Sequence, residues 1–402
     1  MTREYSFINF FRATAALWVI AAHCMFFGGW HKSLIPNPKI AVDLFMMITG
    51  YLMVANAVVR SGFEPLSKPG NWRRFWLRRF FRIAPAYYVS LTLAAVLDRH
   101  FLAGYTDLRA LDPQRWAADY IYDPARITYS VSSIFLHITF LFGLHPTLSV
   151  SSGLPDWSLS LEMQFYLMFP ALLLLMQRTG LTRSALWIGL TAIVLGRLIT
   201  HFVYWYEPSL IILKLQYFLA GMLVFRATGN TVTIKTRILS TMVAVLLVSF
   251  DYRYGKQLIA LPVLLLLMTA CGWLEDSNML PFWLASTFNL RATRFGSDMS
   301  YGVYLFHGFF ISACGSIISS NRSLMILSPT QRTLAMFVFV SIGAYLAALI
   351  VHTLVESPGL RLGKNIIRHV IPIAPDPATP QRPGNDETRS TPEPLINLES
   401  TF

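Results

Sequence analysis

Charged residues are scarce in this sequence. Only 13% of the 402 residues are Asp, Glu, Lys or Arg, whereas soluble domains carry about 25%. Apolar and aromatic residues make up 54% of the chain, and the mean hydropathy is +0.49. This composition excludes an ordinary cytosolic protein and predicts an all-α polytopic membrane protein.

Cysteines and acidic residues are also few. The three cysteines fall in apolar stretches without paired spacing, so we expect neither a disulfide framework nor a zinc site. Asp and Glu number 21 against 33 Lys and Arg, which gives a net charge of +12. In a soluble domain this excess would suggest a nucleic-acid partner. In a membrane protein it fits basic cytoplasmic loops that face anionic lipid headgroups, so we expect membrane lipids and no nucleic acid as partners.

Apolar stretches of spanning length recur along the chain, and those near 20 residues can cross the roughly 30 Å hydrocarbon core as helices. The stretch at 131–145 is too short and too rich in Ser and His for a span, so we expect it to be re-entrant or interfacial. The stretches of spanning length predict about ten transmembrane helices. Seven Lys and Arg lie between Arg60 and Arg82, a bias that predicts that both termini are cytoplasmic. The ten expected spans are 7–29, 40–59, 80–97, 158–177, 184–203, 210–226, 237–250, 257–274, 298–318 and 333–355.

The chain divides into two parts by composition. Residues 1–360 hold all of the expected spans and form one membrane domain. Residues 361–402 begin with a basic juxtamembrane segment. From about residue 372 they become rich in Pro, Thr, Ser and charge, which predicts a disordered cytoplasmic tail because such a segment cannot bury enough apolar surface to fold.

Arg12 and His23 both lie inside the first span. An ionisable group in hydrocarbon is costly unless it lines a cavity or finds a partner. Eleven residues of helix place the two about 20° apart on one face and roughly 16 Å apart along the axis. They are therefore expected to face one cavity. The alternative is that Arg12 extends to lipid phosphate and His23 bonds a neighbouring helix.

Glu162 lies a little over one turn after Trp157, at the expected outer start of an inward-running helix. Glu162 would then lie at about the same depth below the outer membrane boundary as His23. We therefore predict that the two side chains meet. A carboxylate beside an imidazole would orient its tautomer and stabilise the imidazolium, as a general base requires. Trp157 is a substrate contact or, as the alternative, an interface anchor.

Arginines crowd the entry of the third span, interleaved with aromatic residues. Guanidinium groups match phosphates with two hydrogen bonds, so the cluster suits a nucleotide-bearing cosubstrate. Arg79 and Arg82 share one helix face and are the strongest candidates, together with Arg78. For Arg73 and Arg74, the positive-inside bias is a sufficient explanation.

Other polar residues in spans are weaker candidates. Asp43 is expected to partner an Arg or a His, and Arg197 to pair with Glu162, an acceptor or a backbone carbonyl. His307 has two interpretations. It supports the site, or it only makes a hydrogen bond to a neighbouring helix.

Six segments in a fixed order carry a family resemblance. They are Phe11–Leu17 followed by His23, Val42–Leu52, Arg78–Pro85, Trp157–Tyr166, Met299–His307 and Val355–Pro358. With these segments the chain resembles the acyltransferase-3 family of integral membrane acyltransferases. Thr49 stands where a Ser is usual, and Ser357 where a basic residue is common.

The resemblance implies a membrane-bound O-acetyltransferase of the bacterial inner membrane. Acetyl-CoA would be the cosubstrate, with no bound cofactor, and the acceptor would be a sugar hydroxyl of an exported glycan such as exopolysaccharide or lipopolysaccharide. His23 would act as general base or carry the acyl group itself, with Glu162 and Arg12 in catalytic roles. Ser300 and Tyr301, which lie in the fifth segment, would support the substrate.

A transporter or flippase for a glycan or a lipid-linked substrate is the competing hypothesis. Buried Arg, His and Glu would then line a translocation path. We find no inverted repeat in the sequence, and the arginine cluster suits a cosubstrate at one face, so the enzyme is favoured.

Overall fold

The computed structural model describes residues 5–30, 35, 37–112 and 127–370. Over these residues the protein is all-α, without a strand. This confirms the predicted fold class. The expected disordered tail from about residue 372 lies outside the described residues.

The longer helices account for most of the described chain. They are α1 (Ser6–Gly28), α2 (Pro38–Arg60), α3 (Gly70–Val96), α4 (Asp98–Ala110), α6 (Trp157–Thr179), α7 (Leu181–Phe202), α8 (Leu215–Thr228), α9 (Ile234–Val248), α10 (Ala260–Asp276), α12 (Arg291–Ser319), α14 (Pro329–Val351) and α15 (Ser357–Val370). The shorter elements are α5 (Val131–Ile138), η2 (Leu141–Leu144), η3 (Leu148–Val150), η4 (Ile211–Leu213), η5 (Tyr252–Ile259), α11 (Phe282–Phe288), α13 (Arg322–Met325) and the π-helical turn η6 (His352–Glu356).

The number of spanning helices differs from the predicted ten. Within the described part of the chain, seven helices are long and apolar enough to cross a membrane, or eight if the bent pair of α3 and α4 is one span. That pair bends by 78°. The expected spans at 210–226 and 237–250 are too short as helices, since α8 has 14 residues and α9 has 15. At 1.5 Å per residue they measure roughly 21 and 23 Å, less than the hydrocarbon core of roughly 30 Å.

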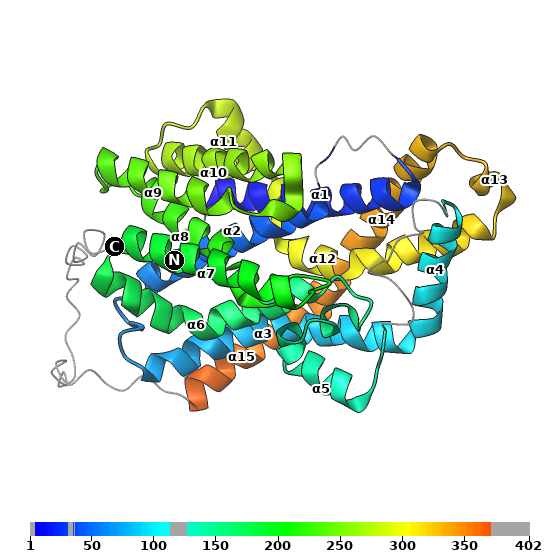
Figure 1. Cartoon of the computed structure of the whole chain (residues 1–402), viewed down its shortest axis with the longest axis horizontal. Helices are drawn as coiled ribbons and strands as arrows, with labels where there is room; N and C mark the ends of the chain where they lie inside the picture. The colour runs from blue at the N-terminus through cyan, green and yellow to red at the C-terminus, as the bar shows by residue number, and fades with distance from the viewer. Residues whose placement is uncertain (1–4, 31–34, 36, 113–126, 371–402) are drawn as a thin grey trace, which may run out of the picture.

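The central helices lie close to parallel with the long axis of the molecule. Figure 1 shows α1, α2, α3, α6 and α12 running roughly along that axis, with α4 standing across one end. Close packing fixes α2 against α8, because a Cβ at Gly50 would overlap the backbone of Phe218 and one at Gly221 would overlap that of Met47. Only glycine permits this approach. It holds α2 in place as one wall of the site described below.

Two further segments pack onto this core. Residues 131–150 form α5, η2 and η3, none of which could span a membrane, as predicted for 131–145. The expected boundary at residue 360 falls inside α15, which lies alongside α3 (Figure 1). Gly359 and Gly363 meet Pro85 and Phe81 of α3. The basic segment after residue 360 is therefore packed onto the membrane domain as far as Val370.

Candidate active site

A cavity of about 140 Å³ lies among the central helices. Residues of α1, α2, α3, α6 and α12 line it. The α2 wall is mostly apolar, while the other helices supply most of the polar groups. The polar lining consists of Arg12, Thr49, Arg79, Arg82, Ser158, Glu162, Tyr166, Ser300, Tyr301 and Tyr304. Six of the twelve residues that were selected as site candidates from the sequence are thus brought together here: Arg12, Arg79, Arg82, Glu162, Ser300 and Tyr301.

Arg12 enters the cavity from α1 and is held by α12. Its Nη2 donates to Ser300 Oγ at 3.1 Å, and Ser300 in turn donates to the carbonyl of Ser297 at 2.7 Å. Tyr301, the next residue, donates to the carbonyl of Ile83 on α3 at 2.7 Å. The segment of α12 that carries the family resemblance therefore ties α1 and α3 together at the cavity wall.

Glu162 lies in this cavity and not beside His23, so the predicted pair is wrong. Thr49 and Tyr166 donate to its two carboxylate oxygens at 3.4 and 3.3 Å, and the charges of Arg12 and Arg82 act on it. The prediction was wrong because it misjudged how deep Glu162 lies in the protein. Residues 149–161 are all buried, so α6 begins inside the protein and not at its outer boundary. Glu162 consequently lies deeper than counting from Trp157 suggested.

His23 instead meets His307. The two rings lie with centroids 5.0 Å apart, one on α1 and one on α12. His23 Nδ1 is 2.9 Å from the carbonyl of Val19, and His307 Nδ1 is 2.8 Å from that of Tyr304. Because a carbonyl oxygen only accepts, Nδ1 of each neutral ring carries the hydrogen and Nε2 has the lone pair. Both rings present their basic nitrogen in the form that a general base or nucleophile needs.

Tyr304 connects this histidine pair to the cavity. Its ring lines the cavity and lies 6.1 Å from the ring of His307, measured between centroids. The hydroxyl of Tyr304 donates to the carbonyl of Pro155 and lies 2.9 Å from Ser158 Oγ. The wall between cavity and histidines is therefore fixed by the chain just before and at the start of α6.

The arginines of α3 divide into two groups. Arg79 and Arg82 line the cavity, whereas Arg78 donates to Glu64 at 2.9 Å and is not among the lining residues. The structure therefore does not bring Arg78 to the cavity with the other two arginines, and its expected contact with the cosubstrate stays a prediction. Arg79 packs its guanidinium over the rings of Phe75 and Tyr166, at 5.6 and 5.7 Å from the centroids. Its Nε is buried without a hydrogen-bond partner among the described residues.

Two glutamates that the sequence did not single out organise these arginines. Glu64 accepts from Arg74 at 2.6 Å and from Arg60 at 3.2 Å, besides Arg78. Burial by itself would raise the pKa of Glu64, but the hydrogen bonds and charges of Arg78 and Arg74 hold it below its ordinary value. Glu356, whose segment carried part of the resemblance, forms an ion pair with Arg82.

Three further candidates lie outside the cavity lining. Asp43 was expected to partner an Arg or a His, but it accepts from the buried Lys214 at 2.9 Å, and Lys214 also donates to Asp251 at 3.1 Å. Trp157 is 5% exposed and packs in the core, so it is neither an interface anchor nor a lining residue. Arg197 is exposed on α7 and donates to the carbonyl of Phe250 at 3.2 Å, which fits the backbone-carbonyl alternative.

A family model described as an acyltransferase domain, that of the acyltransferase-3 family, matches residues 5–353. The chain belongs to the acyltransferase-3 family. The match spans every helix that lines the cavity. This confirms the resemblance carried by the six segments, and the apolar helices of the family domain make the chain a membrane protein.

Curated relatives of this acyltransferase-3 chain include peptidoglycan O-acetyltransferase OatA of Listeria monocytogenes, 31% identical over 173 residues, covering 42% of this chain and 24% of the relative. Putative membrane-bound transacylase BcsY of Komagataeibacter xylinus is 31% identical over 172 residues, 42% of this chain and 38% of the relative. Putative peptidoglycan O-acetyltransferase YrhL of Bacillus subtilis is 26% identical over 330 residues, 74% of this chain and 47% of the relative. The chain thus matches less than half the length of each relative. No solved structure matches it.

Proposed function

We propose that this chain is a membrane-bound O-acyltransferase that moves an acetyl group from cytoplasmic acetyl-CoA to a hydroxyl of a cell-surface glycan. The observation that carries the proposal is the charge of the cavity, which three arginines and one glutamate line. This surplus of positive charge suits a ligand that carries several phosphates. Membership in an acyltransferase family supports CoA thioester as that ligand.

Arg79 and Arg82 would bind the phosphates of the donor. A buried guanidinium N–H without an acceptor is unfavourable, and a phosphate oxygen would relieve that cost at Arg79. Arg82 forms an ion pair with Glu356, so it would interact less strongly with the donor. Arg12, next to Ser300, would contact the donor further into the cavity. Glu162 would balance the arginines when the cavity holds no donor.

His23 would perform the transfer. Arg12 and His23 are roughly 16 Å apart along α1, so an extended donor arm that enters beside the arginines would bring its thioester toward the histidine pair. In a direct transfer, the acceptor hydroxyl gives its proton to Nε2 of His23 while its oxygen attacks the thioester carbonyl carbon. The C–S bond then breaks, and the thiolate takes the proton from the imidazolium.

A two-step route uses the same atoms. Nε2 of His23 attacks the thioester carbonyl and releases CoA thiolate, and the acceptor oxygen then displaces the imidazole from the acyl carbon while its proton goes to the thiolate. Both routes need Nε2 to have its lone pair, which the hydrogen bond from Nδ1 to Val19 favours.

The acceptor proposed is a glycan of the bacterial cell surface, and the location proposed is the inner membrane. Two relatives are named as peptidoglycan O-acetyltransferases, which supports a sugar hydroxyl as acceptor. Exopolysaccharide and lipopolysaccharide belong to the same chemical class. The cytoplasmic side of that membrane supplies acetyl-CoA, and the glycan would be modified at the outer side.

Transfer of labelled acetyl from acetyl-CoA to glycan by the protein purified in nanodiscs tests this function. We expect CoA thiol to be released in step with acetylated glycan, and His23→Ala to lower the rate by about 10² to 10⁴. His145→Ala, in an exposed loop, is the matched control. If cells lacking the protein retained glycan acetylation while lipid-linked glycan accumulated at the inner leaflet, the chain would be a transporter and not an acyltransferase.

A further inference from the structure

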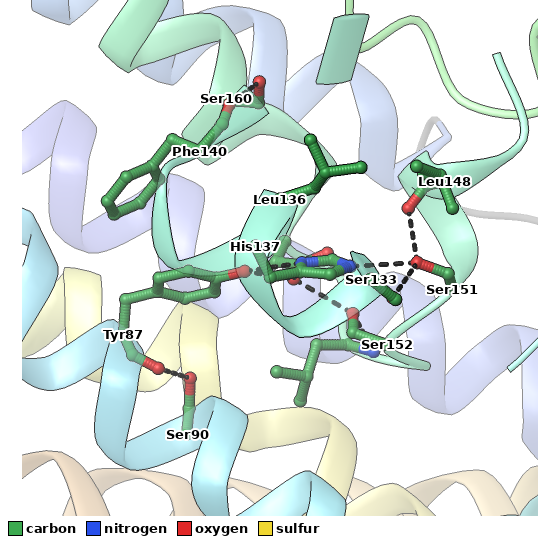
Figure 2. A network of polar contacts seen from close by, with 12 residues as sticks. Tyr87, Ser90, Ser133, Leu136, His137, Phe140, Leu148, Ser151, Ser152 and Ser160 are labelled. Carbon is green, nitrogen blue, oxygen red and sulfur yellow. Dashed lines mark hydrogen bonds and ion pairs between the residues drawn. The ribbon is translucent and has the colours of Figure 1, made fainter. Parts of the chain in front are cut away.

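A second cluster of titratable side chains lies outside the cavity, where α5 packs against α3. His137 sits between two hydroxyl groups: its Nδ1 is 2.8 Å from Tyr87 Oη and its Nε2 is 2.9 Å from Ser151 Oγ (Figure 2). Tyr87 Oη is also 2.9 Å from Asp156 Oδ2. The exposed fractions of Tyr87, His137, Ser151 and Asp156 are 0, 2, 1 and 0%. These four residues form the His137 cluster.

The His137 cluster has the residue types of a hydrolase triad but not the hydrogen bonding of one. Ser151 Oγ is 2.8 Å from the carbonyl of Leu148, which can only accept, so the hydroxyl proton of Ser151 points to Leu148. A nucleophilic serine would instead donate to the histidine. With Ser151 1% exposed, the cluster is a buried structural element.

The same donor count determines the protonation of His137. Since the proton of Ser151 is given to Leu148, the 2.9 Å contact with Ser151 requires His137 Nε2 to donate. Since the proton of Tyr87 is given to Asp156, the 2.8 Å contact with Tyr87 requires His137 Nδ1 to donate as well. Both ring nitrogens then carry hydrogen. All four contacts are satisfied together by an imidazolium.

Asp156 supplies the matching negative charge. Its Oδ2 lies 3.4 Å from His137 Nδ1 and accepts a further hydrogen bond from Ser152 Oγ at 2.9 Å. Asp156 is also the N-cap residue of α6, where the helix dipole favours an anion. These interactions favour an ion pair over a proton transferred through Tyr87 to the carboxyl group.

Other titratable groups around the cluster are neutral or remote. Tyr129 donates to the carbonyl of Ser152 at 2.8 Å. Burial, together with the carboxylates of Asp98 and Asp156, raises its pKa, so it stays protonated at neutral pH. Tyr88, on the same helix as Tyr87, donates its hydroxyl proton to the carbonyl of Ile138 at 2.7 Å.

The His137 cluster is directly connected to the cavity wall. Asp156 is preceded by Pro155, whose carbonyl accepts from Tyr304, and is followed two residues later by Ser158, whose hydroxyl lies 2.9 Å from that of Tyr304. Tyr304 lines the cavity and contacts His307. Whatever fixes Asp156 therefore fixes Tyr304 as well.

We propose that His137 is a positioning residue whose bound proton holds Tyr304 at the wall between the cavity and the histidine pair. This rests on the proposed acyl transfer. Loss of the proton leaves one contact of the His137 cluster without a donor, releases the start of α6 and lets Tyr304 move. Acyl transfer is then lost as the pH rises, in addition to its loss at low pH when His23 becomes protonated.

The protonation state is tested without activity, by ¹⁵N NMR of protein labelled at histidine in nanodiscs. The His137 resonances are assigned as those missing in His137→Gln, with His145→Gln as the matched control. We expect both ring nitrogens of His137 to be protonated at pH 7.5. A non-protonated ring nitrogen at that pH would overturn the proposal.

The coupling to transfer is tested by the pH–rate profile. Wild type is expected to lose kcat at the alkaline side, whereas His137→Gln and Asp156→Asn have kcat lowered by up to about 100-fold and lack that alkaline loss. A histidine with a merely structural role would lower the rate equally at every pH, and that result would overturn the proposal. If NMR finds the imidazolium while wild type has no transferase activity, the proposed function fails and the protonated cluster stands.

Discussion

His23 of α1 and His307 of α12 face each other with ring centroids 5.0 Å apart, and the Nδ1 of each is turned to a backbone carbonyl. The Nε2 atom of each ring therefore keeps its lone pair and can accept a proton. No carboxylate contacts His23 in the described part of the chain. In the proposed transfer, the neighbouring His307 would therefore share the proton that His23 takes up. The following predictions test this pair and the cavity beside it.

His23→Ala should lower the rate of acyl transfer by about 10² to 10⁴ while CoA binding and folding persist, because the role proposed for the residue is on the acyl group and not in the fold. Transfer is measured as labelled acetyl on glycan, CoA binding by calorimetry, and folding by thermal denaturation. Near-normal turnover would remove His23 from the mechanism.

His307→Gln should lower kcat by about tenfold with little change in the KM for acetyl-CoA, since it removes the second basic nitrogen but keeps a donor toward the carbonyl of Tyr304. Steady-state kinetics with acetyl-CoA and glycan separates the two constants. An increase in KM at constant kcat would mean that His307 binds the donor and takes no part in proton sharing.

Arg79→Ala should weaken CoA binding by about ten- to hundredfold, corresponding to about 1.5 to 3 kcal/mol for hydrogen bonds to a charged group. Arg79→Lys should restore only part of the affinity because an ammonium lacks the planar pair of donors. Arg197→Ala removes an exposed arginine from α7 and serves as the control. Calorimetric titration with CoA gives the affinities, and equal Kd values for all four proteins would leave Arg79 without a donor role.

Arg82→Ala should weaken CoA binding less cleanly than Arg79→Ala, because it also removes the guanidinium partner of the buried Glu356, whose other carboxylate oxygen lies 3.1 Å from His352 Nδ1. We therefore expect a lower Tm for Arg82→Ala, and recovery of that Tm in the double variant Arg82→Ala with Glu356→Gln. A Tm that the second substitution does not restore would show that an unpaired Glu356 charge is not the cause of the lower stability of Arg82→Ala.

Glu162→Gln should tighten CoA binding several-fold, since it removes the negative charge that opposes the phosphates in the cavity. The pH at which transfer is lost on acidification should stay the same, because Glu162 is paired with Thr49 and Tyr166 and not with His23. If that pH shifted in the Gln variant, Glu162 would interact directly with His23, and this prediction would be wrong.

Glu64→Gln should destabilise the protein by about 1 to 3 kcal/mol at neutral pH. The Glu64 carboxylate has a lowered pKa in the folded state, so its contribution is present above the unfolded value of about 4.3 and is lost as the pH falls through the folded value. The Tm difference between wild type and Glu64→Gln should therefore shrink on acidification. A constant difference down to pH 3 would mean that its charge is not what stabilises the arginines.

Local spacing was enough to predict several parts of the site. Arg79 and Arg82 are three residues apart on one helix, and this alone placed both on the face that proved to line the cavity. Arg12 was assigned to a cavity because an arginine in hydrocarbon needs one. These inferences rest on helix geometry, which the sequence specifies directly.

Contacts between distant helices could not be predicted in the same way. Asp43 and Lys214 are separated by 171 residues, and Lys214 itself lies at the start of a helix too short for a span. The depth of Glu162 depended on residues 149–156 being buried beneath the protein surface. His137 was not among the site candidates selected from the sequence, yet it is part of a buried network because residues of α3 and of the segment before α6 contact it.

The family match ends at residue 353, yet the ion-pair partner of Arg82 is Glu356, and α15 packs Gly359 and Gly363 against α3, the helix that carries Arg79 and Arg82. A recombinant fragment cut at the family boundary would therefore contain every residue of the cavity but lack the contacts that hold Arg82 and α3 in place. Expression fragments should end after Val370, and C-terminal fusion tags should be attached after it.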